Sequence, residues 1–184
     1  MRDADPQGVV RPDDAPSHPT EPLEMDVSTL VADRTDGPVA PEGAERLQAL
    51  ACDAAEAIAR DAFRYEAAPG TRRYARVRSA PDHDVWVIVW GPGSSVAPHD
   101  HGGSRGAFAV ASGALTDRTS TPTGRNRATV VPPGGVQAVD ADTVHGVANP
   151  TGVSAVSVHV YSPPLASMAF YDGGRRELWR EEVA

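Results

Sequence analysis

Hydrophobic and polar residues alternate in two different ways along this chain of 184 residues, and the change falls near Pro69-Gly70. Before that point, apolar residues recur every three or four positions from Glu42 to about Tyr65, with Glu and Arg on the opposite side. This period predicts an amphipathic helix. The repeating residues are Leu47, Leu50, Ala51, Ala54, Ile58 and Ala62. A shorter helix is expected from Asp26 to about Asp33, with Asp26 as a candidate cap.

After Pro69-Gly70 the chain breaks into short segments rich in Val, Thr and aromatic residues, each ended by Gly, Pro, Asn or Asp. Many short strands with regular turns predict a sandwich or a small barrel. The strands are predicted at Arg72–Arg78, Asp84–Trp90, Ala107–Ala111, Ala114–Ser120, Arg127–Val131, Val136–Val139, Thr143–Val147, Val153–Tyr161 and Met168–Asp172. The last stretch, residues 177–184, fits a strand and a helical turn equally well.

The first 24 residues are rich in Pro and Asp and poor in large apolar residues. Such a segment cannot bury enough surface to offset the entropy lost on ordering, so we expect a disordered tail over residues 1–24. Residues 25–184 are expected to form a single domain, with helices over about 26–66 and a barrel over about 70–175. That length is sufficient for a sizeable core.

Charge and cysteine content exclude several classes of function. The formal net charge of −8 argues against a nucleic-acid partner or an anionic membrane, because neither attracts an acidic surface. The single cysteine, Cys52, rules out an internal disulfide. No apolar run approaches the ~18 residues of a membrane span, and the N-terminus lacks the apolar core of a signal peptide. We therefore expect a cytoplasmic protein, a monomer, with no nucleic-acid or membrane partner.

The main chemical signal is the stretch Pro98-His99-Asp100-His101-Gly102. Residues two apart on a strand share a face, so the imidazoles of His99 and His101 can reach one metal ion. A His-x-His pair alone also fits two ordinary surface residues. Imidazole suits Fe, Zn, Cu and Ni alike, so the pair indicates a metal site without naming the metal. His83, in a predicted turn, is expected to be solvated.

A second polar pattern lies on the predicted strand near residue 160. Ser157, His159 and Tyr161 share one face of that strand, and the intervening valines share the other. In one interpretation, the strand is half exposed and its polar side faces solvent. In the other, the polar side lines a pocket, and His159 holds the Tyr161 hydroxyl by a hydrogen bond. The residues alone leave both interpretations open.

The spacing around the histidines resembles the two motifs of the cupin family. Gly93 precedes His99 by five intervening residues, and His145 is followed by three residues and then Asn149. The resemblance implies a mainly β fold, the cupin double-stranded β-helix (a jelly-roll-like barrel), here with N-terminal α-helices. It also implies that His145 is a third metal ligand. The glutamate that usually follows the first motif is missing, since residues 102–106 read Gly-Gly-Ser-Arg-Gly.

More specifically, the chain resembles the cysteine dioxygenase family, the thiol dioxygenases of the cupin superfamily. The resemblance covers about residues 72–172 and rests on Trp90-Gly91-Pro92-Gly93, Pro98–Gly102, His145 with Asn149-Pro150, and the stretch SVHVYSPP that begins at Ser157. It implies Fe(II) held by His99, His101 and His145, and a catalytic set of Ser157, His159 and Tyr161. Animal members carry a cysteine crosslinked to the tyrosine. This chain has Gly106 at that position, so no crosslink is expected.

The resemblance also bears on the substrate. Members that act on cysteine place Arg two residues after a Tyr, whereas members that prefer 3-mercaptopropionate place Gln there. Tyr74-Ala75-Arg76 fits the Arg pattern. A guanidinium offers a planar fork that matches a carboxylate, so Arg76, Tyr74 and Tyr161 are expected to bind the substrate. The alternative is that Arg76 is a surface arginine, like its neighbours on the same strand.

The function implied by this resemblance is that of a non-haem Fe(II) thiol dioxygenase, which oxidises L-cysteine with O₂ to cysteine sulfinate. A first alternative is the same chemistry on 3-mercaptopropionate or another small thiol. A second alternative, from another class, is a non-catalytic cupin that binds a metal or a small ligand as a sensor. The intact Ser157/His159/Tyr161 set argues against the sensor, because a sensor needs no such set.

Overall fold

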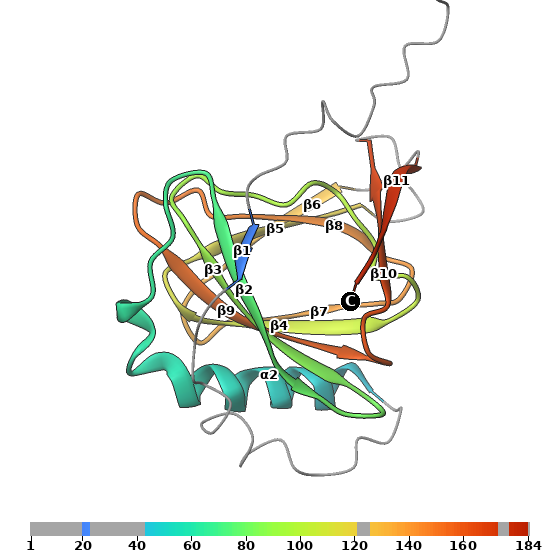
Figure 1. Cartoon of the computed structure of the whole chain (residues 1–184), viewed down its shortest axis with the longest axis horizontal. Coiled ribbons are helices and arrows are strands. Elements are labelled where there is room, and N and C mark those ends of the chain that lie inside the picture. The colour runs from blue at the N-terminus through green and yellow to red at the C-terminus, as the bar shows by residue number, and fades with distance from the viewer. Residues whose placement is uncertain (1–19, 23–42, 121–125, 173–176, 184) are drawn as a thin grey trace, which may run out of the picture.

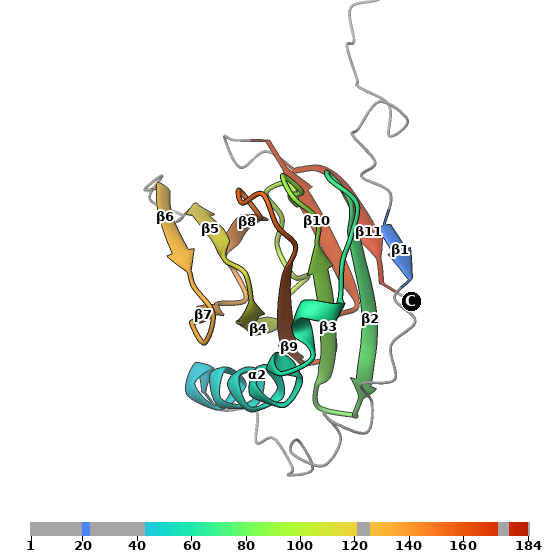
Figure 2. The ribbon, with the colours of Figure 1, turned by 90° about the vertical axis from the view of Figure 1, so that its left-hand side faces the viewer.

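The computed structural model describes residues 20–22, 43–120, 126–172 and 177–183. Its elements are β1 (Thr20–Pro22), α2 (Ala44–Ala59), the 3-10 helix η2 (Ala62–Arg64), β2 (Arg72–Ser79), β3 (Asp84–Trp90), β4 (Arg105–Ser112), β5 (Leu115–Ser120), β6 (Asn126–Val131), β7 (Val136–Val139), β8 (Val144–Ala148), β9 (Ala155–Ser162), β10 (Ser167–Tyr171) and β11 (Glu177–Glu182). The strands form two facing walls, and α2 lies across the outer face of one of them (Figures 1 and 2).

The wall beneath α2 is a six-stranded sheet with the order β1-β2-β3-β9-β4-β7. Its pairs are antiparallel, except that β1 runs parallel to β2. Alternate valines of β3 and β9 pack with the apolar side of α2, where Ile58 is 1% exposed. Burial of a side chain of this size contributes about 1.5–3 kcal/mol. The helix therefore supplies the second half of a core that the sheet could not close alone.

The other face of the same sheet turns inward. Along β9, Val156, Val158 and Val160 face α2, while Ser157, His159 and Tyr161 face the interior, and all six are buried. The half-exposed interpretation of this strand is therefore wrong, because both of its faces are covered. Trp90, Phe108 and Leu115 belong to a second apolar cluster between the two walls.

The facing wall contains the three-stranded sheet β6-β5-β8 and the hairpin β10-β11. The chain around His99 joins them, because His99 forms isolated bridges with both His145 of β8 and Phe170 of β10. His99 N donates to the carbonyl of His145 at 2.8 Å, and His145 N donates back at 2.9 Å. The first histidine of the His-x-His motif is thus held by backbone hydrogen bonds between two strands, although it belongs to neither.

Every strand predicted after residue 70 is present, with ends shifted by two residues or fewer. The long predicted helix is α2 followed by η2, and the undecided C-terminal stretch contains β11. The helix predicted at 26–33 lies outside the described residues. Within the predicted tail, Thr20–Pro22 form β1, and the remainder of residues 1–24 also lies outside them.

One local prediction is wrong. His83 was expected to be solvated, yet it is 1% exposed, and its Nδ1 lies 2.9 Å from Oδ1 of Asp82. The turn between β2 and β3 folds back against β9, where the Ser162 hydroxyl donates to the carbonyl of Asp82 at 2.7 Å. In the part of the chain that the structure describes, no helix combines the length and apolarity needed to span a membrane.

Candidate metal centre and its cavity

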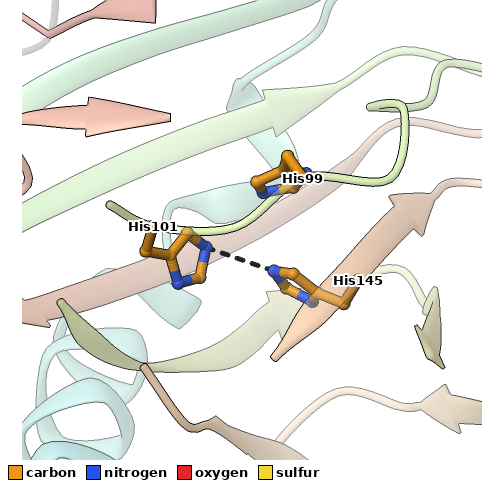
Figure 3. A group of neighbouring side chains, drawn as sticks. All are labelled: His99, His101 and His145. Atoms are coloured by element: carbon orange, nitrogen blue, oxygen red, sulfur yellow. Dashed lines mark hydrogen bonds between the residues drawn. The ribbon is translucent and has the colours of Figure 1, made fainter. Parts of the chain in front are cut away.

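Three buried histidines meet between the two walls of strands. His99 and His101 lie on the connection between β3 and β4, and His145 lies on β8 (Figure 3). One ligand nitrogen from each can be chosen so that all three lie within 4.8 Å of one another, and Nε2 of His101 is 3.2 Å from Nε2 of His145. Two nitrogens bound to one ion at about 2.1 Å are separated by about 3.0–3.4 Å. The observed 3.2 Å fits a shared ion.

Hydrogen bonds fix which ring nitrogen two of these histidines offer to a metal. Nδ1 of His99 lies 2.8 Å from the carbonyl oxygen of Ala97. Nδ1 of His145 lies 2.8 Å from Oδ1 of Asp117, and both residues are buried. A carbonyl or a carboxylate only accepts, so each Nδ1 carries the proton and each Nε2 keeps a lone pair that a metal ion could use.

Asp117 was not among the residues singled out in the sequence. Its signal was its place on the predicted strand Ala114–Ser120, where it shares a face with Leu115, which is fully buried. An acidic residue on the inward face of a strand needs a partner, because an unpaired buried charge is costly. That partner is His145, on the neighbouring strand β8.

Asp100, between the two histidines of the motif, holds their loop in place. Its Oδ1 accepts hydrogen bonds from the backbone amides of Gly102 at 3.0 Å and Ala169 at 3.2 Å, and Tyr171 donates its hydroxyl proton to Oδ2. Burial alone would raise the pKa of Asp100, but these hydrogen bonds lower it below its usual value. Asp100 therefore anchors the ligand loop to β10 as an ionised carboxylate.

Burial sets the charge of the centre. It lowers the pKa of His99 and of His101 well below the usual value for histidine, and the neighbouring His145 lowers both further. Burial likewise lowers the pKa of His159 to about 3. These imidazoles are neutral at neutral pH, which is the form that binds metals. Across the described residues, His99, His101 and His145 are the one group of side chains that could hold a metal ion, and it contains no carboxylate.

Ser157, His159 and Tyr161 form a buried hydrogen-bonded set beside the histidines. Ser157 Oγ lies 2.9 Å from Nε2 of His159, and Nδ1 of His159 lies 3.2 Å from the hydroxyl oxygen of Tyr161. The rings of Tyr161 and His101 meet edge to face, with centroids 4.8 Å apart. Burial raises the pKa of the Tyr161 phenol, and the charge of Asp84 adds to the effect, so the hydroxyl keeps its proton.

A cavity of about 380 Å³ opens onto this group and lies within the usual size range of ligand pockets. His99, His145, His159 and Tyr161 line it, together with Tyr74 and Trp86. Trp86, Tyr161 and Leu165 form an apolar cluster there, and Val183 packs against it from the C-terminal end of the chain.

An arginine also lines the cavity, but it is Arg72 and not the predicted Arg76. Its guanidinium lies 5.5 Å from the ring centroid of Trp90, and its Nε is buried without a hydrogen-bond partner among the described residues. Burial lowers the pKa of Arg72, while the charge of Glu181 opposes that shift. Arg76, expected at the substrate, is instead exposed, and its guanidinium lies 5.4 Å from the ring centroid of Trp86. Arg76 is not among the lining residues.

Two walls of antiparallel strands around a buried three-histidine cluster define a double-stranded β-helix protein with a candidate metal centre. The chain is similar to a protein with a double-stranded β-helix domain from Klebsiella pneumoniae subsp. pneumoniae MGH 78578, at 22% identity and a TM-score of 0.50. That match covers 62% of this chain and 94% of the other. A cupin superfamily protein from Desulfitobacterium hafniense DCB-2 matches at 13% identity and a TM-score of 0.45, covering 53% and 83%.

The sequence model of a family described as "Cysteine dioxygenase type I" matches residues 45–174. The chain belongs to this family, which confirms the resemblance found in the sequence. The matched span begins in α2 and runs past β10, so it includes all three histidines of the cluster. Family and cluster together support a metal-dependent dioxygenase function.

Proposed function

We propose that this protein is a non-haem Fe(II) thiol dioxygenase that oxidises L-cysteine with O₂ to cysteine sulfinate. The observation that carries the proposal is a single cavity lined by two histidines of the three-histidine cluster, by Tyr161 and by the half-buried Arg72. In this reaction the thiol sulfur takes up both oxygen atoms and loses four electrons, and O₂ accepts those four electrons. The atoms balance without any external reductant.

The donor set supports the choice of a thiol substrate, whereas the choice of iron rests on the family to which the chain belongs. Three neutral imidazoles leave a divalent ion with its full charge, which favours an anionic ligand such as a thiolate. When bound, Fe(II) would keep the substrate sulfur as a thiolate near neutral pH and make it reactive toward O₂. His99, His101 and His145 would hold the ion, with Asp117 and the Ala97 carbonyl fixing the rings of His145 and His99.

The protein's own groups bind and orient the rest of the substrate. Arg72 is the cation that lines the cavity, and its planar fork matches the carboxylate of cysteine. The protonated Tyr161 hydroxyl donates a second hydrogen bond to that carboxylate. Tyr74 lines the same cavity and packs against Trp86, with ring centroids 5.7 Å apart. Arg76 is the alternative carboxylate ligand. It lies on the same face of β2, but it is exposed and is not among the residues that line the cavity.

Two matched variants decide between the arginines. Arg72→Ala is expected to raise the KM for cysteine roughly 10- to 100-fold, the loss expected for a charge-assisted hydrogen-bonded pair. Arg76→Ala removes the same side chain from the same face of β2, but away from the cavity, and is expected to change KM far less. A large KM change in Arg76→Ala with none in Arg72→Ala would assign the carboxylate to Arg76.

The experiment that tests the function is oxygen uptake by protein loaded anaerobically with Fe(II). L-Cysteine and 3-mercaptopropionate are supplied in separate runs, and the sulfinate is identified by mass. Uptake matched one to one by cysteine sulfinate is the expected result. Preference for 3-mercaptopropionate would keep the reaction and change the substrate. Absence of uptake with either thiol, despite bound iron, would exclude both substrates and leave another small thiol or, if further thiols also fail, the sensor.

A further inference from the structure

A fourth residue, Trp90, extends the hydrogen-bonded set at its far end. Its indole Nε1 donates to Ser157 Oγ at 2.8 Å. The full chain of contacts therefore runs from Trp90 on β3 through Ser157 and His159 to Tyr161 on β9. None of these four side chains is more than 7% exposed. Ser157 is fully buried and is not among the residues that line the cavity, so its hydroxyl depends on its neighbours in this set for hydrogen bonds.

The direction of these hydrogen bonds follows from the chemistry of the first donor. An indole N–H can donate but cannot accept, so Ser157 Oγ is the acceptor in its contact with Trp90. Ser157 has one proton of its own, and its other hydrogen-bond partner among the described side chains is Nε2 of His159. A buried hydroxyl proton without an acceptor is costly. Ser157 therefore donates to His159.

The same reasoning gives the direction of the last hydrogen bond, between His159 and Tyr161. If Nε2 accepts, the neutral imidazole of His159 must carry its proton on Nδ1. Nδ1 then donates to the hydroxyl oxygen of Tyr161, 3.2 Å away. Tyr161 consequently keeps its own proton for a partner in the cavity that it lines. If the hydrogen bonds ran in the opposite direction, the Tyr161 hydroxyl would donate to His159. It would then present only a lone pair to the substrate carboxylate.

We infer that Trp90 is a positioning residue that sets the proton order of the Ser157–His159–Tyr161 chain, so that Tyr161 faces the substrate as a hydrogen-bond donor. The proton order follows from the contacts alone, whereas its role in turnover rests on the proposed function. Trp90 is well fixed for this role. It is 1% exposed, its carbonyl accepts from Nδ2 of Asn149 at 3.0 Å, and the Arg72 guanidinium covers its ring.

The decisive measurement is the tautomer of His159, read from long-range ¹H–¹⁵N spectra of the full chain labelled with ¹⁵N-histidine. Zn²⁺ serves as a diamagnetic metal, and His159→Gln identifies the His159 signals among the six histidines. The wild type is expected to show the proton on Nδ1. Trp90→Phe keeps a ring beneath Arg72 but removes the indole donor. It is expected to release the Ser157 hydroxyl and give a mixture of tautomers.

Trp86→Phe is the matched control. It removes an indole from the same strand and the same cavity, but that indole donates to Oδ2 of Asp84 at 2.8 Å, outside the chain of contacts. His159 is expected to keep its Nδ1–H tautomer in this variant. In the iron-loaded enzyme, Trp90→Phe is expected to lower kcat/KM for cysteine roughly 2- to 10-fold, the loss of one hydrogen bond.

Several results would overturn the inference. They are an Nε2–H tautomer in the wild type, an unchanged tautomer in Trp90→Phe, and an equal shift in Trp86→Phe. The wild-type spectrum needs no variant, so the inference stays testable if Trp90→Phe does not fold. A wild-type enzyme that fails to oxidise cysteine would contradict the proposed function and leave the tautomer result standing.

Discussion

Asp117 Oδ1 lies 2.8 Å from Nδ1 of His145, and neither side chain is more than 2% exposed. The two residues sit on neighbouring strands, β5 and β8, which pair antiparallel. The carboxylate fixes the ring of His145 and the tautomer in which Nε2 is free. It is also the one acidic group hydrogen-bonded to a ligand histidine among the described residues, so it supplies negative charge that the neutral ligands lack.

Replacing Asp117 should therefore weaken metal binding without removing a ligand. Asp117→Asn is expected to lower metal affinity about 10- to 100-fold, the usual cost of losing an outer-shell partner of a histidine ligand. The measurement is competition between the protein and a chelator for Fe(II) under anaerobic conditions. Asp140→Asn, at an exposed site, is the control and should bind metal as the wild type does. Equal affinity in all three proteins would exclude a role for Asp117 at the metal.

Gly106 gives a second prediction, because a side chain at this position would face Tyr161. A Cβ at Gly106 would lie 3.2 Å from Cε1 of the Tyr161 ring. In Gly106→Cys, a thioether between Sγ and that ring is expected when the iron-loaded protein turns over with O₂. The thiol and the ring each lose one hydrogen, and O₂ takes up both hydrogens with their two electrons to become hydrogen peroxide.

Intact mass measures this crosslink as the loss of two hydrogens, and peptide mapping places it. Ala107→Cys puts a thiol on the next residue of β4, where the side chain packs in the cluster with α2. It should show no loss. Because 3.2 Å is a tight approach, the Tyr161 ring must shift by a few tenths of an ångström. An active Gly106→Cys enzyme that never loses mass would show that the ring cannot do so.

The sequence could predict most of this site because two of its patterns are strong: the alternation along β9 and the spacing of the histidines. Alternation along β9 separates its valines from Ser157, His159 and Tyr161, and the structure buries these two sets on opposite faces of the sheet. The His-x-His spacing and the later His145 identify the cluster in which the three imidazoles meet. These features are local in the chain, or they follow a spacing that the family shares.

What could not be predicted depends on how strands far apart in the sequence align. Alternation places Arg72 and Arg76 on one face of β2, and the register with β3 sets them opposite Trp90 and Trp86, two tryptophans that both line the cavity. Which arginine lines the cavity depends on the path of each long side chain in the folded protein. Arg72 is half-buried and lines the cavity, whereas Arg76 is exposed and does not. Asp117 likewise becomes a partner of His145 only when β5 pairs with β8.

Acid should destabilise the metal-free protein. Burial lowers the pKa of His159 to about 3, while an unfolded histidine titrates near about 6.5. Between these values the unfolded chain binds a proton that the folded protein does not bind. The free energy of unfolding therefore falls as the pH drops below about 6.5, by about 1.4 kcal/mol per pH unit for this group. His99 and His101 act in the same direction.

Urea unfolding between pH about 7 and about 5 measures this slope. His159→Gln is expected to remove one group's share of the slope and leave the rest. Metal-loaded protein should lose stability more steeply, because protons compete with the metal for the imidazoles. A slope that is the same in His159→Gln and in the wild type would show that His159 is not the group that resists protonation.

Tyr161→Phe is expected to lower kcat/KM for cysteine and to uncouple O₂ consumption from sulfinate formation. The phenylalanine keeps the ring against His101 but loses the hydroxyl that His159 holds at 3.2 Å. Without this donor the substrate is held less firmly beside the metal site, so kcat/KM is expected to fall about 10-fold, and more O₂ should be consumed than sulfinate formed. Parallel measurement of O₂ uptake and sulfinate gives both numbers. Tyr65→Phe, on the helix side of the sheet, should remain fully coupled. A Tyr161→Phe enzyme with normal rate and normal coupling would remove Tyr161 from the reaction.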